Sequence, residues 1–179
     1  MPRPVDPTLE KKIADAALLL LTEGGLESVT MRDVAKAAGT TTPTLYARFQ
    51  DREALLWALV NRVNDEVFRR VEKAKSAEQI GETLVRYLVS FPTHAELISR
   101  SWPMVMNSDR PKPVMNLAKK LMMKEHKFTS AEAERTAIAM FAQVFGMAIL
   151  IRNAGEDNPV SKTLLHTSRK ALAKLARGV

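Results

Sequence analysis

The chain has 179 residues, of which 46% are hydrophobic and 26% are charged, so it is long enough and apolar enough to bury a core. It contains no cysteine, which excludes disulfides and thiolate metal sites, and its three histidines are scattered, so we expect no metal and no cofactor. Stretches rich in Ala, Leu, Lys, Arg, Glu and Met predict an all-α fold. The first residues lack the apolar segment of a signal peptide, which favours a cytoplasmic location.

The charge distribution does not reveal where a partner would bind. The net charge of +7 is compatible with a polyanion, yet residues 1–50 hold six Lys and Arg against six Asp and Glu, so the excess lies downstream. The longest apolar run, 137–151, is too short to span a bilayer and is interrupted by Gln143 and Gly146. We therefore expect no membrane partner.

Four helices are expected in the first part of the chain. The first ends at a pair of glycines, the second follows the capping residue Thr30 and stops at Gly39, the third is short, and Asp51 caps the fourth. Pro43 is tolerated because it falls in the first turn of the third helix. The expected spans are 7–24, 31–38, 43–49 and 52 to about 75.

The second part of the chain predicts further helices with one irregular stretch. Ser76 with Gln79 signals a fifth helix that ends at Pro92, and three prolines are expected to divide residues 93–113 into short pieces. The later helices are expected at 114–127, at 130 to about 154 behind the pair Thr129 and Glu132, and from Pro159 onward. This makes eight or nine helices and no strands.

A helix-turn-helix is predicted between residues 30 and 50. Ala35 is small enough for two helices to approach closely, Gly39 can adopt the positive φ of a tight turn, and Leu45 buries the second helix against the first. Since Leu45 and Phe49 share the buried face, other residues of that helix turn outward. These outward residues are Pro43, Tyr46, Ala47 and Gln50. In a helix-turn-helix such a face meets base edges in the major groove.

Over about residues 13–60 the chain resembles the TetR family of transcriptional regulators. The matching residues are Ala16-Ala17, Gly25, Thr30, Arg32, Ala35, Gly39, Thr44-Leu45-Tyr46, Phe49, Arg52 and Leu55. It departs from the family at Thr40, where an aliphatic residue is usual, and at Arg48, where a histidine is frequent. The resemblance implies an N-terminal three-helix DNA-binding domain, 1–52, joined by a long helix to a helical effector-binding and dimerisation domain within 53–179.

The resemblance also implies two roles for the DNA-binding residues. Phosphate contacts are implied for Thr30, Thr44 and Tyr46, with charge added by Arg52, and such contacts position a protein on DNA. Base-edge contacts, which specify sequence, are implied for Arg32, Thr41, Thr42, Pro43, Ala47 and Arg48. Arg32 is the leading candidate, because a guanidinium can bind guanine through two hydrogen bonds.

The C-terminal part predicts a homodimer through residues 130–177. The run 137–151 is apolar nearly all round its helix, which requires cover on several sides, and the last helix has an apolar stripe. Two copies of this helix pair would form a four-helix interface, whereas the alternative is that both helices fill the core of one chain. The apolar stripe consists of Val160, Leu164, Leu165, Ala171, Leu172 and Leu175.

An effector pocket is expected in the same part, because methionines are frequent there and adapt to irregular ligands. The candidate ligand-binding residues are Trp102, Met106, Met140 and Gln143. The alternative for the apolar ones is ordinary core packing, and for Gln143 a hydrogen bond within the core or across the dimer. No nucleophile with a base, phosphate loop or metal spacing occurs, so no enzyme is expected.

Together these features predict a ligand-responsive DNA-binding regulator. We expect a repressor that binds a palindromic double-stranded operator as a homodimer and is released by a small-molecule effector. The alternative is a helical small-molecule-binding protein without DNA function.

Overall fold

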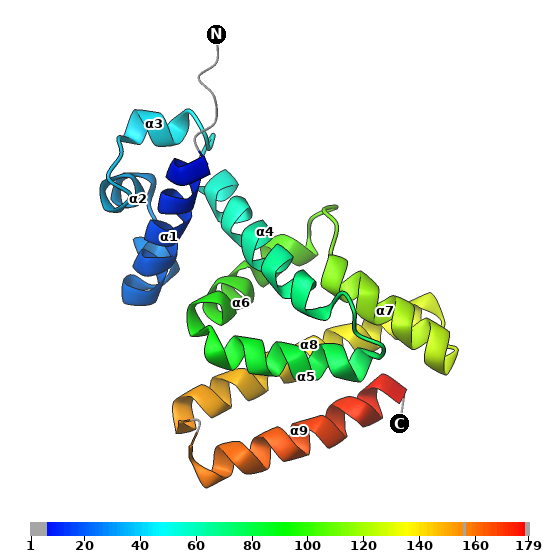
Figure 1. Ribbon diagram of the computed structural model, residues 1–179. Helices are drawn as coiled ribbons and strands as arrows, with labels where there is room; N and C mark the ends of the chain where they lie inside the picture. Colours follow the sequence, from blue (N-terminus) through cyan, green and yellow to red (C-terminus); the bar gives the residue numbers. More distant parts are fainter. Residues whose placement is uncertain (1–6, 156, 178–179) are drawn as a thin grey trace. The chain divides into compact units, whose positions relative to one another are not determined.

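The computed structural model describes residues 7–155 and 157–177, and throughout these ranges the regular structure is helical, with no strand (Figure 1). The all-α fold class is therefore confirmed. The helices are α1 (Pro7–Gly24), α2 (Met31–Ala37), α3 (Thr42–Tyr46), α4 (Arg52–Val71), α5 (Ala77–Ser90), α6 (Pro92–Met106), α7 (Pro113–His126), α8 (Ser130–Ala154) and α9 (Pro159–Arg177). A short 3-10 helix, η1 (Leu26–Ser28), lies between α1 and α2.

The described chain divides into two compact units. The first extends to Val63 and includes Glu96–Pro103, and the second consists of Asn64–Ala95 and the residues from Met104 onward. This division lies within α4, later than the boundary at residue 52 that the sequence suggested. The long helix α4 thus begins in one unit and ends in the other.

The first unit is built around α1, which packs against η1 and α2, while α2 packs against α3. Its apolar periodicity explains this arrangement, because Ile13, Ala17 and Leu21 recur on one face and are fully buried. Leu45 of α3 and Leu55 of α4 are also fully buried. The small helices therefore share one core instead of standing alone.

The second unit is organised by α8, which packs against α5, α7 and α9 (Figure 1). Helices α5 and α9 are also in contact. Gly81 on α5 has no side chain, which allows α9 to approach closely at this point. A Cβ atom at Gly81 would lie 3.0 Å from Cδ1 of Leu172, whose own side chain is fully buried. A side chain at this point would therefore require Leu172 to shift by a few tenths of an ångström.

Side-chain caps determine where several helices begin. Thr129 and Glu132 form a complete capping box at the start of α8, as their spacing predicted. Hydrogen bonds from the Thr129 hydroxyl and backbone N–H hold the pKa of the Glu132 carboxyl below its ordinary value. Ser76 caps α5 by accepting a hydrogen bond from the N–H of Gln79 at 3.2 Å, which confirms that signal as well.

Three predicted boundaries were wrong. Residues 93–113 do not break into short pieces, because α6 runs from Pro92 to Met106 with Pro103 inside it. A proline removes one helical hydrogen bond, and here that loss does not end the helix. Helix α4 stops at Val71, since the following residues form the turn into α5, where the Lys75 N–H bonds Oε1 of Gln79. Helix α3 ends at Tyr46 and not at Phe49.

Candidate nucleic-acid interface

The turn between α2 and α3 has the geometry that the sequence predicted. Ala35 is buried, and Gly39 adopts φ +65°, a left-handed conformation that glycine adopts without strain. The N–H of Thr40 bonds the carbonyl of Ala35 at 2.9 Å, and the N–H of Gly39 bonds the carbonyl of Lys36 at 3.2 Å. This pair of bonds is a Schellman motif, which ends α2 sharply and directs the chain into α3.

Helix α3 is short and is held by its own cap and by one buried side chain. The Thr41 hydroxyl accepts a hydrogen bond from the N–H of Thr44 at 3.3 Å, and the two threonine hydroxyls lie 2.8 Å apart. Leu45 is fully buried, so the opposite side of the helix faces solvent. The exposed residues there are Pro43, Tyr46, Ala47 and Gln50, as predicted, while Thr42 and Thr44 are half-buried.

The residue before α2 has a structural role in addition to any contact with DNA. Thr30 caps α2, since its hydroxyl accepts a hydrogen bond from the N–H of Asp33 at 3.1 Å and donates one to the Asp33 carboxylate at 2.6 Å. Arg32 follows two residues later and is exposed. Arg32 has no hydrogen-bond or ion-pair partner among the described residues, so its guanidinium is free to bind another molecule.

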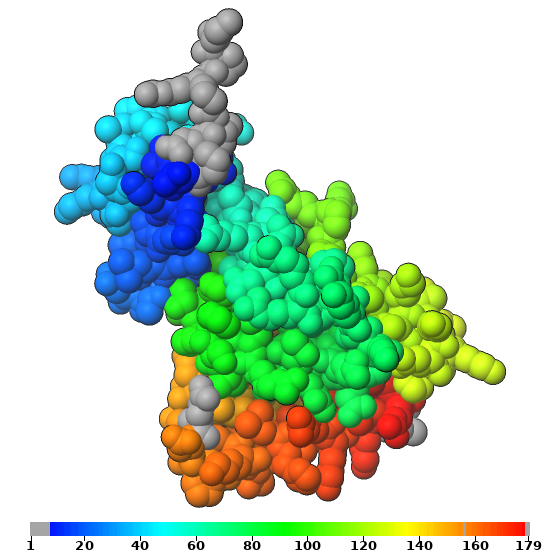
Figure 2. Space-filling model, viewed as in Figure 1, coloured from blue at the N-terminus to red at the C-terminus, as the bar shows by residue number. Residues whose placement is uncertain are grey.

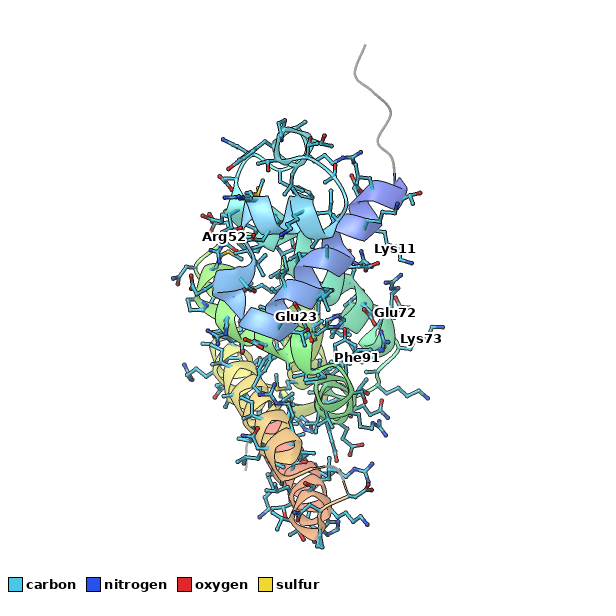
Figure 3. All side chains as sticks on the ribbon, turned by 90° about the vertical axis from the view of Figure 1, so that its left-hand side faces the viewer. Lys11, Glu23, Arg52, Glu72, Lys73 and Phe91 are labelled. Carbon is cyan, nitrogen blue, oxygen red and sulfur yellow. The ribbon has the colours of Figure 1, made fainter. Side chains whose placement is uncertain are left out.

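Two other predicted DNA contacts are already engaged within the first unit. Arg48 forms an ion pair with Glu10 of α1 at 3.2 Å, and its side chain is only 18% exposed. Arg52, which is labelled in Figure 3, donates hydrogen bonds to the carbonyls of Leu26 at 2.6 Å and Val29 at 2.7 Å. Sequence reasoning missed both contacts, because the partners are 38, 26 and 23 residues away and no local pattern links them.

The exposed residues of the helix-turn-helix thus form a surface with a definite composition. It combines the free cation Arg32, the hydroxyl of Tyr46, whose residue is 52% exposed, and small residues such as Pro43 and Ala47. We call the exposed and half-exposed set Thr30, Arg32, Thr41, Thr42, Pro43, Thr44, Tyr46 and Ala47 the α2–α3 surface. In Figure 2 the atoms of α3, drawn in cyan, lie at the surface of the first unit.

The candidate ligand-binding residues divide between the two units. Trp102 belongs to the first unit and is half-buried, whereas Met106, Met140 and Gln143 belong to the second. Met140 is buried, and the Gln143 side-chain amide bonds the carbonyl of Ser168 at 3.5 Å. Gln143 therefore has a partner within its own chain. Among the described residues, no group of three or more His, Asp or Glu side chains could hold a metal ion.

Helix α8 is the single described helix long and apolar enough to cross a membrane. Length and composition alone are weak evidence, because the core helix of a soluble protein passes the same test. In this chain α8 packs against three other helices. It also exposes the apolar residues Ile138, Ile149 and Leu150.

Comparisons with known proteins agree with this geometry. The family model described as bacterial regulatory proteins, tetR family, matches residues 13–59, which include α2, α3 and the first turns of α4. Over residues 13–59 the chain is thus similar to the TetR family. An HTH-type transcriptional regulator of Mycobacterium tuberculosis, itself uncharacterized, is 38% identical over 87 residues, which is 49% of this chain but only 42% of that protein. Proteins of the TetR family are regulators and not enzymes, in agreement with the sequence-based expectation.

Two further relatives extend the comparison. The HTH-type transcriptional repressor KstR2 of Rhodococcus jostii is 33% identical over 72 residues, covering 37% of this chain and 35% of that protein. A TetR variant of Acinetobacter baumannii, solved in complex with minocycline, superposes with a TM-score of 0.67 over 97% of this chain and 96% of its own. At 22% identity this second likeness shows the fold alone. It supports an N-terminal helix-turn-helix followed by a helical C-terminal domain.

Proposed function

We propose that this protein is a DNA-binding transcriptional regulator of the TetR family that acts as a homodimer on a palindromic operator. The observation that carries the proposal is the α2–α3 surface, where a capped helix turns its small and polar residues to solvent beside the unpaired Arg32. Such a helix fits the major groove of DNA. The proposal includes a cytoplasmic location, because bacterial DNA lies in the cytoplasm.

Within the α2–α3 surface we assign two kinds of contact. Tyr46, Thr44 and Thr30 are assigned to phosphates, which fix the position of the protein on the duplex. Base edges are assigned to Arg32, Thr41, Thr42, Pro43 and Ala47. Arg48 can join them only if its ion pair with Glu10 opens, which costs little because Glu10 is 52% exposed.

Dimerisation is assigned to α8 and α9, within residues 130–177. Large apolar side chains are exposed on both helices, including Ile149 at 43%, Leu150 at 52% and Val160 at 57%. An apolar face of this kind is stabilised when a second copy covers it, and a two-fold pair of α8 and α9 makes a four-helix interface. Leu172 is not part of this face, because it is fully buried against Gly81.

The regulatory ligand is assigned to the second unit, with Met106, Met140 and Gln143 as candidate contacts. We propose repression that the effector relieves, since one relative is named as a repressor and a protein of the same fold was solved with minocycline. Screening small molecules for a rise in Tm and then for loss of DNA binding tests this assignment. A ligand that raises the Tm and leaves DNA binding unchanged would contradict it.

The DNA function itself is tested by salt titration with matched variants. Affinity for duplex DNA should fall linearly with the logarithm of salt concentration, and Arg32→Gln should weaken it. Arg86→Gln removes the same charge from an exposed residue of α5 and serves as the control. If the two variants weaken binding equally, the α2–α3 surface is not the interface. If the parent binds no DNA, the alternative of a ligand-binding protein without DNA function is favoured.

A further inference from the structure

Arg52 ties the first residue of α4 to the backbone that leads into α2. Its Nε donates to the carbonyl of Val29 at 2.7 Å, and its Nη2 donates to the carbonyl of Leu26 at 2.6 Å. Both bonds are part-buried, and hydrogen bonds from a charged donor to such acceptors are stronger than neutral ones. Because one planar guanidinium binds two carbonyls three residues apart, the whole segment is held in one orientation.

The segment that Arg52 holds is the one that positions the α2–α3 surface. Val29 is fully buried and immediately precedes Thr30, the residue that caps α2. Arg32, the leading candidate for base contact, follows three residues after Val29. A shift of the Val29 carbonyl would therefore move the start of α2 and the Arg32 side chain with it.

Other hydrogen bonds also hold this segment, and at its end the N–H of Thr30 donates to the carbonyl of Ser28 at 2.9 Å. The hydroxyl of Ser28 donates to the carbonyls of Leu20 and Gly25, and the N–H of Val29 donates to the carbonyl of Leu26 at 3.2 Å. These contacts fasten η1 to the end of α1. Among the described hydrogen bonds, Arg52 supplies the one that the Val29 carbonyl accepts.

We propose that Arg52 is a positioning residue for DNA recognition, acting through the Leu26 and Val29 carbonyls that set the start of α2. The inference rests on the proposed DNA function and assigns Arg52 a role different from the phosphate contact that the family resemblance implied. Two of its N–H groups are committed to the backbone, so its contribution to DNA binding comes mainly from the geometry it imposes.

Arg52→Lys separates the two roles, because lysine keeps the charge but lacks the planar fork that reaches two carbonyls. We expect Arg52→Lys to weaken DNA binding by about tenfold with an unchanged salt dependence. We also expect faster hydrogen exchange at the amides of Val29, Thr30 and Asp33. If Arg52 only contacted a phosphate, the opposite pattern would be seen. The DNA affinity of Arg52→Lys would then stay close to that of the parent. For Arg52→Gln, the slope of log affinity against log salt concentration would fall in magnitude by about one.

Arg62→Gln is the matched control, since Arg62 lies on the same helix and ties it to α1 through an exposed ion pair with Asp15 at 3.2 Å. It should leave exchange at Val29–Asp33 and the salt dependence unchanged. If it weakens binding as much as Arg52→Lys does, general loosening of α4 explains both, and the proposal is overturned.

A measurement on the unaltered protein covers the case in which the variants do not fold. The Nε–H signal of Arg52 in an NMR spectrum should exchange with water more slowly than that of the exposed Arg32. Equal exchange rates for the two arginines would overturn the proposal. This measurement and the amide exchange need no DNA, so they test the Arg52 assignment separately from the DNA function. Failure of the DNA function would instead appear as an unaltered protein that binds no DNA.

Discussion

The α2–α3 surface and the exposed face of α8 and α9 differ in what they leave to solvent. In α2 and α3 the apolar side chains Val34 and Leu45 are fully buried, and the exposed residues other than Tyr46 are polar or small, so this surface offers little apolar area to a partner. Helix α8 instead exposes Leu150 and α9 exposes Val160. The difference indicates two partners of different chemistry: a hydrated polyanion for the first surface and a second apolar surface for the other.

The largest expected effect lies beneath the second surface. Leu172 is fully buried against Gly81, so Leu172→Ala should lower the free energy of unfolding by about 2–5 kcal/mol through lost burial and the cavity that remains. Urea unfolding measures this change. Leu164→Ala, at a half-buried position of the same helix, should cost clearly less. Equal losses would mean that the two faces of α9 do not differ as described.

A smaller effect is expected on the exposed face itself. Burial of Leu150 in the proposed interface would stabilise the dimer by about 1.5–3 kcal/mol per chain. Leu150→Glu replaces this contribution with a buried charge, so the dissociation constant of the dimer should be much higher than that of the parent. Sedimentation velocity over a concentration series measures this shift. Far-ultraviolet circular dichroism should stay unchanged, because Leu150 is 52% exposed in the single chain. An unchanged dimer would exclude this face from the interface.

On the α2–α3 surface, Arg32→Ala should change sequence preference. Loss of a bidentate contact with guanine would cost about 1–3 kcal/mol at one operator position per half-site and relax the preference there. Binding measured against operator variants at every position tests this. A uniform loss at all positions would reassign Arg32 to a phosphate.

Tyr46→Phe should have the smallest effect of the four. It removes one hydroxyl, so affinity should fall for every DNA sequence by roughly the ~1 kcal/mol of a lost hydrogen bond, with preference intact. Fluorescence anisotropy with a preferred and a scrambled duplex measures both quantities. A change in preference would move Tyr46 from the phosphate contacts to the base contacts.

Local signals in the sequence predicted much of the fold. The caps at Thr30 and Thr129, the turn at Gly39 and the burial of Leu45 each depend on residues close in the chain, and the structure confirms them. Pro103 misled the prediction, because a helix held by packing tolerates one missing hydrogen bond.

Contacts between distant segments could not be predicted in the same way. The ion pair of Arg48 with Glu10 joins residues 38 positions apart, and nothing in the pattern around either residue specifies the other. Likewise, periodicity placed Leu172 and Val160 on one stripe of α9, although the first is fully buried and the second is 57% exposed. A helical stripe shows which residues are apolar, whereas the neighbouring helices decide which of them are covered.

We propose that two copies of this chain bind DNA through their α2–α3 surfaces. Selection of binding sites from a random duplex library, with the purified full chain, tests it most directly. We predict enrichment of an inverted repeat whose half-sites lie about one helical turn, or a multiple of it, apart. Recovery of a single unrepeated site, or of no common sequence, would contradict the account.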